Sequence, residues 1–99
     1  MIPIDVAIDD YLHTIVRTRP WTKKREEELL EGLSAWLYEQ PDPRVALDEI
    51  APALAEQYAA AASLSATERD ELLAALDHLY AWSVYADQID HNPFAAQPA

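Results

Sequence analysis

Apolar residues recur at helical spacing along most of this chain, and that period limits the fold more than any other feature. Four stretches place apolar side chains three and four residues apart, which gives each stretch one apolar face. No useful length of the sequence alternates in the manner of a strand. The single Gly is also too few for a β fold that is rich in tight turns. The sequence therefore predicts an all-α fold.

Proline residues divide the first half of the pattern into two helices. The first helix is expected over residues 5–18 and ends before Pro20, because the residue that precedes a proline avoids the α region. The second helix is expected over residues 22–39, with Thr22 as its N-cap. The two prolines within residues 40–43 then predict a turn.

Two further helices are expected in the second half. Pro52 suits the first position of a helix, where its missing N–H costs nothing, and that helix fades within residues 59–62. Ser65 and Glu68 form a capping box, which predicts a fourth helix that runs to about residue 85.

The apolar faces of the four helices predict one core. Gly32 interrupts the second helix at a cost of about 1 kcal/mol relative to Ala, so we expect a close contact between helices there. The residues expected in the core are Ile8, Tyr11, Leu12, Ile15, Val16, Leu29, Leu30, Leu33, Trp36, Leu37, Leu54, Tyr58, Leu72, Leu73, Leu76, Leu79, Tyr80 and Val84.

Charge is distributed unevenly along the chain. The formal net charge is −11, which is unfavourable for binding to phosphates. Five of the seven Lys and Arg residues nevertheless lie within residues 17–25, and no acid interrupts them. We therefore expect a dipolar molecule with one basic spot on an acidic body. The candidate DNA-binding residues are Arg17, Arg19, Thr22, Lys23, Lys24 and Arg25.

Two interpretations of this basic segment remain open from the sequence. The N-terminus of a helix favours phosphate through its dipole and its free N–H groups, which supports a contact with DNA. Three acids, Glu26, Glu27 and Glu28, follow directly and weaken the positive field, so the segment is also consistent with a solvated turn.

Metal, cofactor and catalytic chemistry have little support in the sequence. The chain has no Cys. Asp10 and His13 have the spacing of half a di-iron motif, but no second half occurs on another helix, and His78 and His91 have no convincing ligand partners. One Gly cannot build a loop that cradles phosphates. We expect no metal, no cofactor and no enzymatic activity from this chain.

The sequence also lacks features of membrane insertion or export. No apolar run approaches the roughly 20 residues that span a bilayer. Residues 1–5 lack the basic and apolar regions of a signal peptide. A cytoplasmic protein with no membrane partner is the expectation.

The most specific pattern lies at the end of the fourth helix. Residues 73–82 read Leu-Ala-Ala-Leu-Asp-His-Leu-Tyr-Ala-Trp, and residues 89–93 read Ile-Asp-His-Asn-Pro. Upstream, residues 47–52 read Leu-Asp-Glu-Ile-Ala-Pro. This order resembles the N-terminal core-binding domain of tyrosine recombinases, which include phage integrases. In that family Leu-x-x-Leu-x-x-Phe/Leu-Tyr-x-Trp precedes a short turn and Ile-x-x-Asn-Pro. The resemblance covers about residues 9–94.

The resemblance implies a four-helix, SAM-like orthogonal bundle that binds one side of double-stranded DNA during site-specific recombination and integration. It implies a core-binding-like domain over residues 1–91, with residues 92–99 as a tail or the start of an interdomain linker. The family's catalytic domain, which forms a phosphotyrosine, does not fit within 99 residues. Expected partners are double-stranded DNA, a recombinase catalytic domain and other protomers.

Departures from the family pattern keep an alternative open. Glu26 stands where the family often has an aromatic residue, and Asp87 stands where the exit turn usually has Gly. Asp77, His78 and Ala81 replace basic residues of the fourth helix. Residues 66–91 hold six acids and one base, and a surface of that charge repels phosphates. The alternative is a stand-alone acidic helical module, derived from the same fold, that binds proteins.

Overall fold

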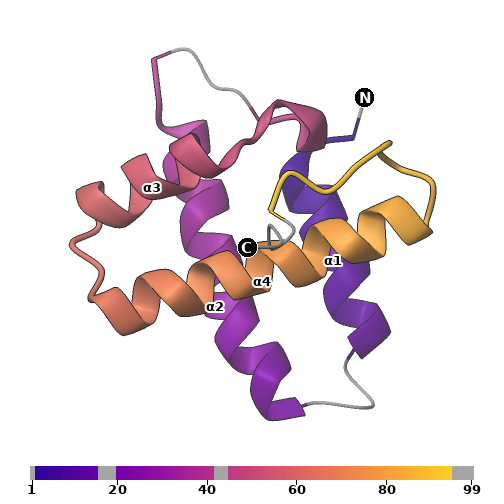
Figure 1. The fold of residues 1–99 in the computed structure, drawn as a ribbon, viewed down its shortest axis with the longest axis horizontal. Helices are drawn as coiled ribbons and strands as arrows, with labels where there is room; N and C mark the ends of the chain where they lie inside the picture. Colours follow the sequence, from indigo (N-terminus) through magenta and orange to yellow (C-terminus); the bar gives the residue numbers. More distant parts are fainter. Residues whose placement is uncertain (1, 16–19, 42–44, 95–99) are drawn as a thin grey trace, which may run out of the picture.

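The structure, a computed structural model, describes residues 2–15, 20–41 and 45–94, and within these it leaves out the side chains at positions 14, 15 and 20–23. Over these residues the fold is all-α, as predicted (Figure 1). The elements are α1 (Ile4–Ile15), α2 (Pro20–Tyr38), the 3₁₀ turn η1 (Leu47–Glu49), α3 (Pro52–Ala61) and α4 (Ala66–Tyr85).

The expected start of the second helix at Thr22 is wrong. Helix α2 begins at Pro20, so Thr22 lies in its first turn and is not the N-cap. A proline is well suited to the first position of a helix, because its φ is already helical and that position has no intrahelical N–H partner. The same rule places Pro52 correctly at the start of α3. The expected end of the first helix, at residues 16–18, lies outside the described residues.

The predicted capping box at the start of α4 is confirmed. The Ser65 hydroxyl accepts a hydrogen bond of 3.1 Å from the backbone N–H of Glu68, and the Glu68 carboxylate accepts one of 3.0 Å from the N–H of Ser65. Ser63, in the preceding turn, adopts a left-handed φ of 54°. The turn and the cap together direct the chain from α3 into α4.

Helix α4 crosses both α1 and α2, and α3 packs against α2 and α4 (Figure 1). One core lies between these helices. At its centre Tyr80 is fully buried, and its hydroxyl donates a hydrogen bond to the backbone carbonyl of Leu47. Burial raises the pKa of Tyr80 well above the ordinary range of a tyrosine.

The predicted core stripes are confirmed where the structure describes their side chains. Leu54, Tyr58, Leu73, Trp36 and Val84 are half-buried at its edge, and Ile15 and Val16 are not described. The remaining predicted core residues are buried: Ile8, Tyr11, Leu12, Leu29, Leu30, Leu33, Leu37, Leu72, Leu76, Leu79 and Tyr80.

Gly32 marks a close contact between helices, as expected. A Cβ atom at this position of α2 would overlap the hydroxyl of Tyr58 on α3. The Tyr58 ring also packs against Trp36, with ring centroids 5.7 Å apart. The missing side chain at position 32 therefore lets the Tyr58 ring lie against α2.

Backbone bonds join the start of the chain to its middle, a feature that the sequence did not indicate. Pro3 and Ala46 form an isolated antiparallel bridge. The N–H of Ile4 donates to the carbonyl of Val45 at 2.6 Å, and the N–H of Leu47 donates to the carbonyl of Ile2 at 2.8 Å. These bonds hold η1 beside the beginning of α1.

The folded body continues past His91. The Asn92 amide donates to the side chain of Asp77 on α4 at 2.7 Å, and its oxygen accepts a hydrogen bond of 2.9 Å from the N–H of Phe94. The Phe94 ring then packs on Tyr80 at a centroid distance of 4.9 Å. Through these bonds the Asn-Pro motif holds the chain against α4 after the helix has ended, and we call this contact the clasp.

Candidate functional site

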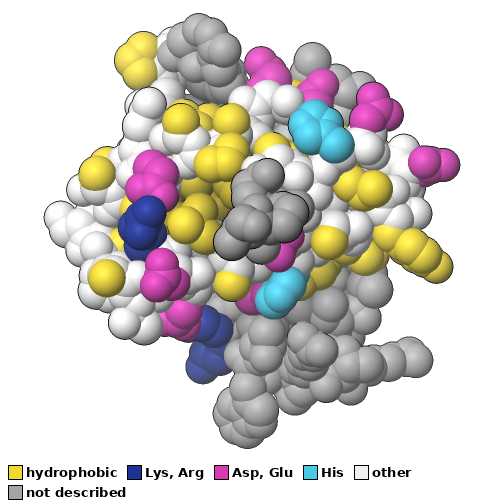
Figure 2. Space-filling model, in the orientation of Figure 1, with side chains coloured by type: hydrophobic (Ala, Val, Ile, Leu, Met, Phe, Trp, Pro, Cys, Tyr) yellow, Lys and Arg dark blue, Asp and Glu magenta, His cyan; other side chains and the backbone are white. Residues whose placement is uncertain are grey.

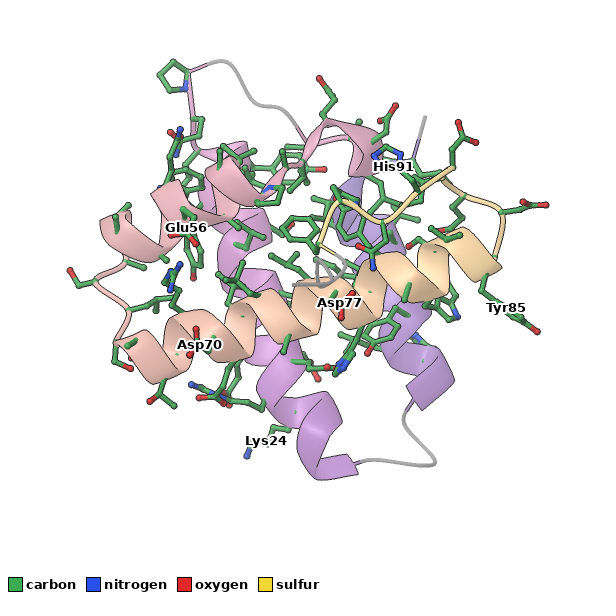
Figure 3. All side chains as sticks on the ribbon, in the orientation of Figure 1. Lys24, Glu56, Asp70, Asp77, Tyr85 and His91 are labelled. Carbon is green, nitrogen blue, oxygen red and sulfur yellow. The ribbon has the colours of Figure 1, made fainter. Side chains whose placement is uncertain are left out.

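The structure describes only part of the predicted basic spot. Arg17 and Arg19 lie outside the described residues. Thr22 and Lys23 belong to the first turns of α2, but their side chains are not described. Lys24 is exposed and lies near the end of α2 that projects beyond α4 (Figure 3).

Arg25, the last candidate, is held in ion pairs. Its guanidinium contacts three carboxylates: Glu71 at 2.9 Å and Glu68 at 3.7 Å on α4, and Glu28 at 3.4 Å on α2. The hydrogen bond to Glu71 is the main reason that the pKa of Arg25 is raised. Arg25 therefore links α2 to α4, and neighbouring carboxylates balance its charge.

Arg69 is paired in the same way. Its guanidinium donates bidentate hydrogen bonds to Glu56 on α3, the shortest of which is 2.7 Å long. This ion pair lowers the pKa of Glu56, chiefly through the hydrogen bonds. On the face shown in Figure 2, the Lys and Arg side chains have acidic side chains beside them. Within the basic spot, carboxylates thus balance the charge of Arg25, and outside it Glu56 balances the charge of Arg69.

Glu26, one of the three acids that follow the basic segment, does not fit the interpretation of that segment as a solvated turn. Glu26 is only 5% exposed, and its carboxylate lies between α1 and α4. It accepts a hydrogen bond of 2.9 Å from the Tyr11 hydroxyl, and its second oxygen lies 2.6 Å from Nδ1 of His78. A buried carboxylate needs such partners, because losing water without replacement bonds is costly.

The spacing of α2 explains why Glu26 is buried. Glu26 precedes Leu29 and Leu30 by three and four residues, so it lies on the apolar stripe that continues to Leu33. The family pattern often has an aromatic residue here. The apolar stripe indicates that position 26 faces the core, whereas the negative charge of Glu26 suggests a solvated side chain. His78 is half-exposed and takes part in this network.

Helix α4 presents a weakly acidic outer surface. Asp70 and Asp77 lie on the side of α4 turned toward the viewer in Figure 3, and Tyr85 projects from its end with 89% of its surface exposed. Asp77 is held by Asn92. Arg25 lies beside Ala74 and His78, but its guanidinium is paired with Glu71.

The described residues contain no cluster of metal-binding side chains. No group of three His, Asp or Glu residues among them could hold a metal ion. The side chain of His13 lies against Asp9, and Asp10 contributes no metal site with it in this part of the chain.

No described helix is both long enough and apolar enough to cross a membrane.

Comparison of the chain with protein-family models, curated proteins and solved structures found no match. The resemblance to recombinase core-binding domains therefore depends on the residues quoted above. In the structure those residues have packing roles: Tyr80 is buried, Trp82 packs on Tyr11 at 6.0 Å, and Asn92 clasps α4.

Proposed function

We propose that this domain binds double-stranded DNA as the core-binding-type module of a site-specific recombinase or integrase, with phosphate contact confined to the N-terminal end of α2. The observation that carries this proposal is the exposed Lys24 on the projecting end of α2, directly after Arg17, Arg19 and Lys23 in the sequence. A positive helix terminus and a run of bases act together on a phosphate.

The four helices and the clasped exit of α4 support the resemblance on which the recombinase assignment depends. Helix α4 lies across α1 and α2, as an orthogonal, SAM-like bundle requires (Figure 1). Asp87, where the family usually has Gly, has a left-handed φ of 63°, which is the backbone geometry that favours Gly. These observations concern the fold, so DNA contact itself depends on the basic segment.

A second candidate is an acidic module that binds proteins. It is favoured by the ion pairs that neutralise Arg25 and Arg69, since these leave carboxylates dominant on the described surface. Phosphates are repelled by such a surface, whereas Lys-rich and Arg-rich protein segments are attracted to it.

Fluorescence anisotropy with a labelled DNA duplex tests the first candidate. We expect binding at about 20 mM salt that weakens steeply as salt is added. Lys24→Ala should make the slope of log affinity against log salt less steep by about 1, because one phosphate contact is lost. Arg44→Ala removes the same charge from an isolated position in the sequence and should leave the slope unchanged.

Two outcomes would contradict the DNA proposal. Absence of binding at low salt would exclude an autonomous contact and favour the acidic module. Equal effects of Lys24→Ala and Arg44→Ala would show that the domain responds only to its total charge, and that the end of α2 is not a site.

A further inference from the structure

A groove of about 540 Å³ lies between η1 and the segment that follows α4. We call it the C-terminal groove. Its floor is apolar: Ile2, Ile89 and Pro93 are half-buried and partly accessible, and Leu47, Ile50 and Tyr80 lie buried beneath. The volume falls within the range of sites that hold a ligand or an anchoring side chain.

The rim of the C-terminal groove is acidic. Four exposed carboxylates belong to its lining, from Asp48 and Glu49 on one side and from Asp87 and Asp90 on the other. No Lys or Arg is among the described residues that line it, and His91 is the sole titratable group there that can carry a positive charge. The groove therefore combines an apolar floor with a negative rim.

A buried hydrogen-bond acceptor adds to this pattern. The side-chain oxygen Oε1 of Gln88, another residue of the groove lining, is inaccessible to solvent and has no hydrogen-bond partner within the described part of the chain. A buried acceptor left without a donor is energetically unfavourable. An N–H group of a ligand that reached this oxygen would supply the missing donor.

We propose that the C-terminal groove binds a basic, amphipathic peptide segment of a protein partner. An aliphatic or aromatic side chain of the peptide would lie on the floor, against the partly accessible side chains of Ile2, Ile89 and Pro93. Lys or Arg side chains on either side would pair with the carboxylates of the rim. Apolar anchors at the centre and complementary charges around them are the usual division of roles in such interfaces.

Charge decides between this occupant and the others that a groove of this size could hold. A second copy of the chain also carries a net charge of −11, so the long-range force between two copies is repulsive. Nucleic acid is repelled by the same rim. A basic peptide is attracted from a distance and is also able to cover the apolar floor.

The position of the C-terminal groove separates this inference from the proposed contact with DNA. His91 lies at one end of the molecule in Figure 3, and Lys24 lies at the opposite end. The two surfaces share no residue. The groove could therefore bind its partner whether or not the domain binds DNA.

Fluorescence anisotropy with a short labelled peptide that alternates Lys and Leu tests the proposal on the full chain. We expect saturable binding that weakens with salt. A peptide with Ser in place of every Leu should bind about tenfold more weakly, because it cannot cover the floor. A peptide with Glu in place of every Lys should show no binding.

A matched pair of triple variants tests the location. Glu49→Gln/Asp87→Asn/Asp90→Asn removes three charges from the rim, and Asn is tolerated at the left-handed position 87. Asp9→Asn/Glu27→Gln/Glu31→Gln removes three charges from a second acidic groove, between α1 and α2. We expect about fivefold to tenfold weaker binding for the first triple and less than about twofold for the second.

Chemical-shift mapping supplies a readout that does not depend on variants. The proposal requires that the Lys-Leu peptide shift amides of residues 47–51 and 87–93. Shifts centred on α1 and α2, equal weakening by both triples, or equal binding of the Ser-substituted peptide would each overturn it. Lys24→Ala should leave peptide binding unchanged, so failure of the DNA proposal and failure of this one are distinguishable.

Discussion

The Tyr11 hydroxyl donates a hydrogen bond of 2.9 Å to the buried carboxylate of Glu26, across the contact between α1 and α2. His78 approaches the other carboxylate oxygen from α4. One acidic side chain therefore joins three helices at a point where an apolar residue would simply pack. The arrangement makes the stability of the bundle depend on partners that satisfy a buried carboxylate.

Removal of the Tyr11 hydroxyl should destabilise the protein. Tyr11→Phe leaves one oxygen of Glu26 without its donor, and hydrogen bonds to charged groups are worth about 1.5–3 kcal/mol. We expect the free energy of unfolding, measured by urea denaturation, to fall by that amount. Combining Tyr11→Phe with Glu26→Gln should cost less than the sum of the two single changes. Strict additivity would mean that the bond contributes nothing.

Because Gly32 contacts Tyr58, we expect the effect of a substitution at Gly32 to depend on the side chain at position 58. Gly32→Ala favours the helix by about 1 kcal/mol, but the new methyl group meets the Tyr58 hydroxyl. We expect Gly32→Ala to be neutral or destabilising in the wild-type chain. In a Tyr58→Phe background it should raise the melting temperature. A stabilising effect of the same size in both backgrounds would contradict the steric explanation.

Two carboxylates should make the fold sensitive to acid. The pKa of Glu56 is lowered by its hydrogen bonds to Arg69, and the pKa of Glu68 is lowered mainly by the capping bond from the Ser65 N–H. A lowered pKa in the folded state means that the stabilisation is complete above the ordinary value of about 4.5 and is lost as pH falls through the folded value.

Thermal unfolding from about pH 6 down to about pH 3 checks this expectation. Glu56→Gln should be less stable than wild type near neutral pH and should lose less of its stability on acidification. Glu39→Gln changes an exposed carboxylate at the end of α2 and serves as the control. If Glu56→Gln and Glu39→Gln followed the same pH dependence, the ion pair with Arg69 would not be a source of acid sensitivity.

The clasp at Asn92 should control how firmly the end of the folded body is held. Asn92→Ala removes its bonds to Asp77 and to the N–H of Phe94, so the Phe94 ring should leave Tyr80. We expect a loss of about 1–2 kcal/mol in the free energy of unfolding. Hydrogen exchange at Phe94 should also become faster. Unchanged exchange there would show that ring packing holds this segment without the clasp.

The helices were largely predictable because their signals are local. The spacing of apolar residues, Pro52 at a helix start and the Ser65 capping box each act within a few residues, and the structure confirms them. Thr22 was misassigned because both it and Pro20 are good starting signals, and the proline comes first.

The site was less predictable because it depends on contacts between distant residues. The charges of Glu71 and Glu68 meet Arg25 only after α4 has folded across α2. Glu26 looked like a surface acid because its partners, Tyr11 and His78, are 15 and 52 residues away in the sequence. The apolar stripe of α2 indicates which face Glu26 lies on, but no periodicity or local motif identifies the distant residues that it meets there.

The bridge between Pro3 and Ala46 brings two residues that are far apart in the chain next to each other in the fold. It closes a loop that contains all of α1 and α2, so its formation is among the least local events in folding. Ile2, whose carbonyl holds Leu47 in place, also lines the groove that the end of the chain completes. Residues near the start of the chain and residues near its end therefore form one wall of the C-terminal groove together. A fusion partner attached before Ile2 would therefore adjoin a wall whose other part, from Asp87 to Pro93, is remote from it in the sequence.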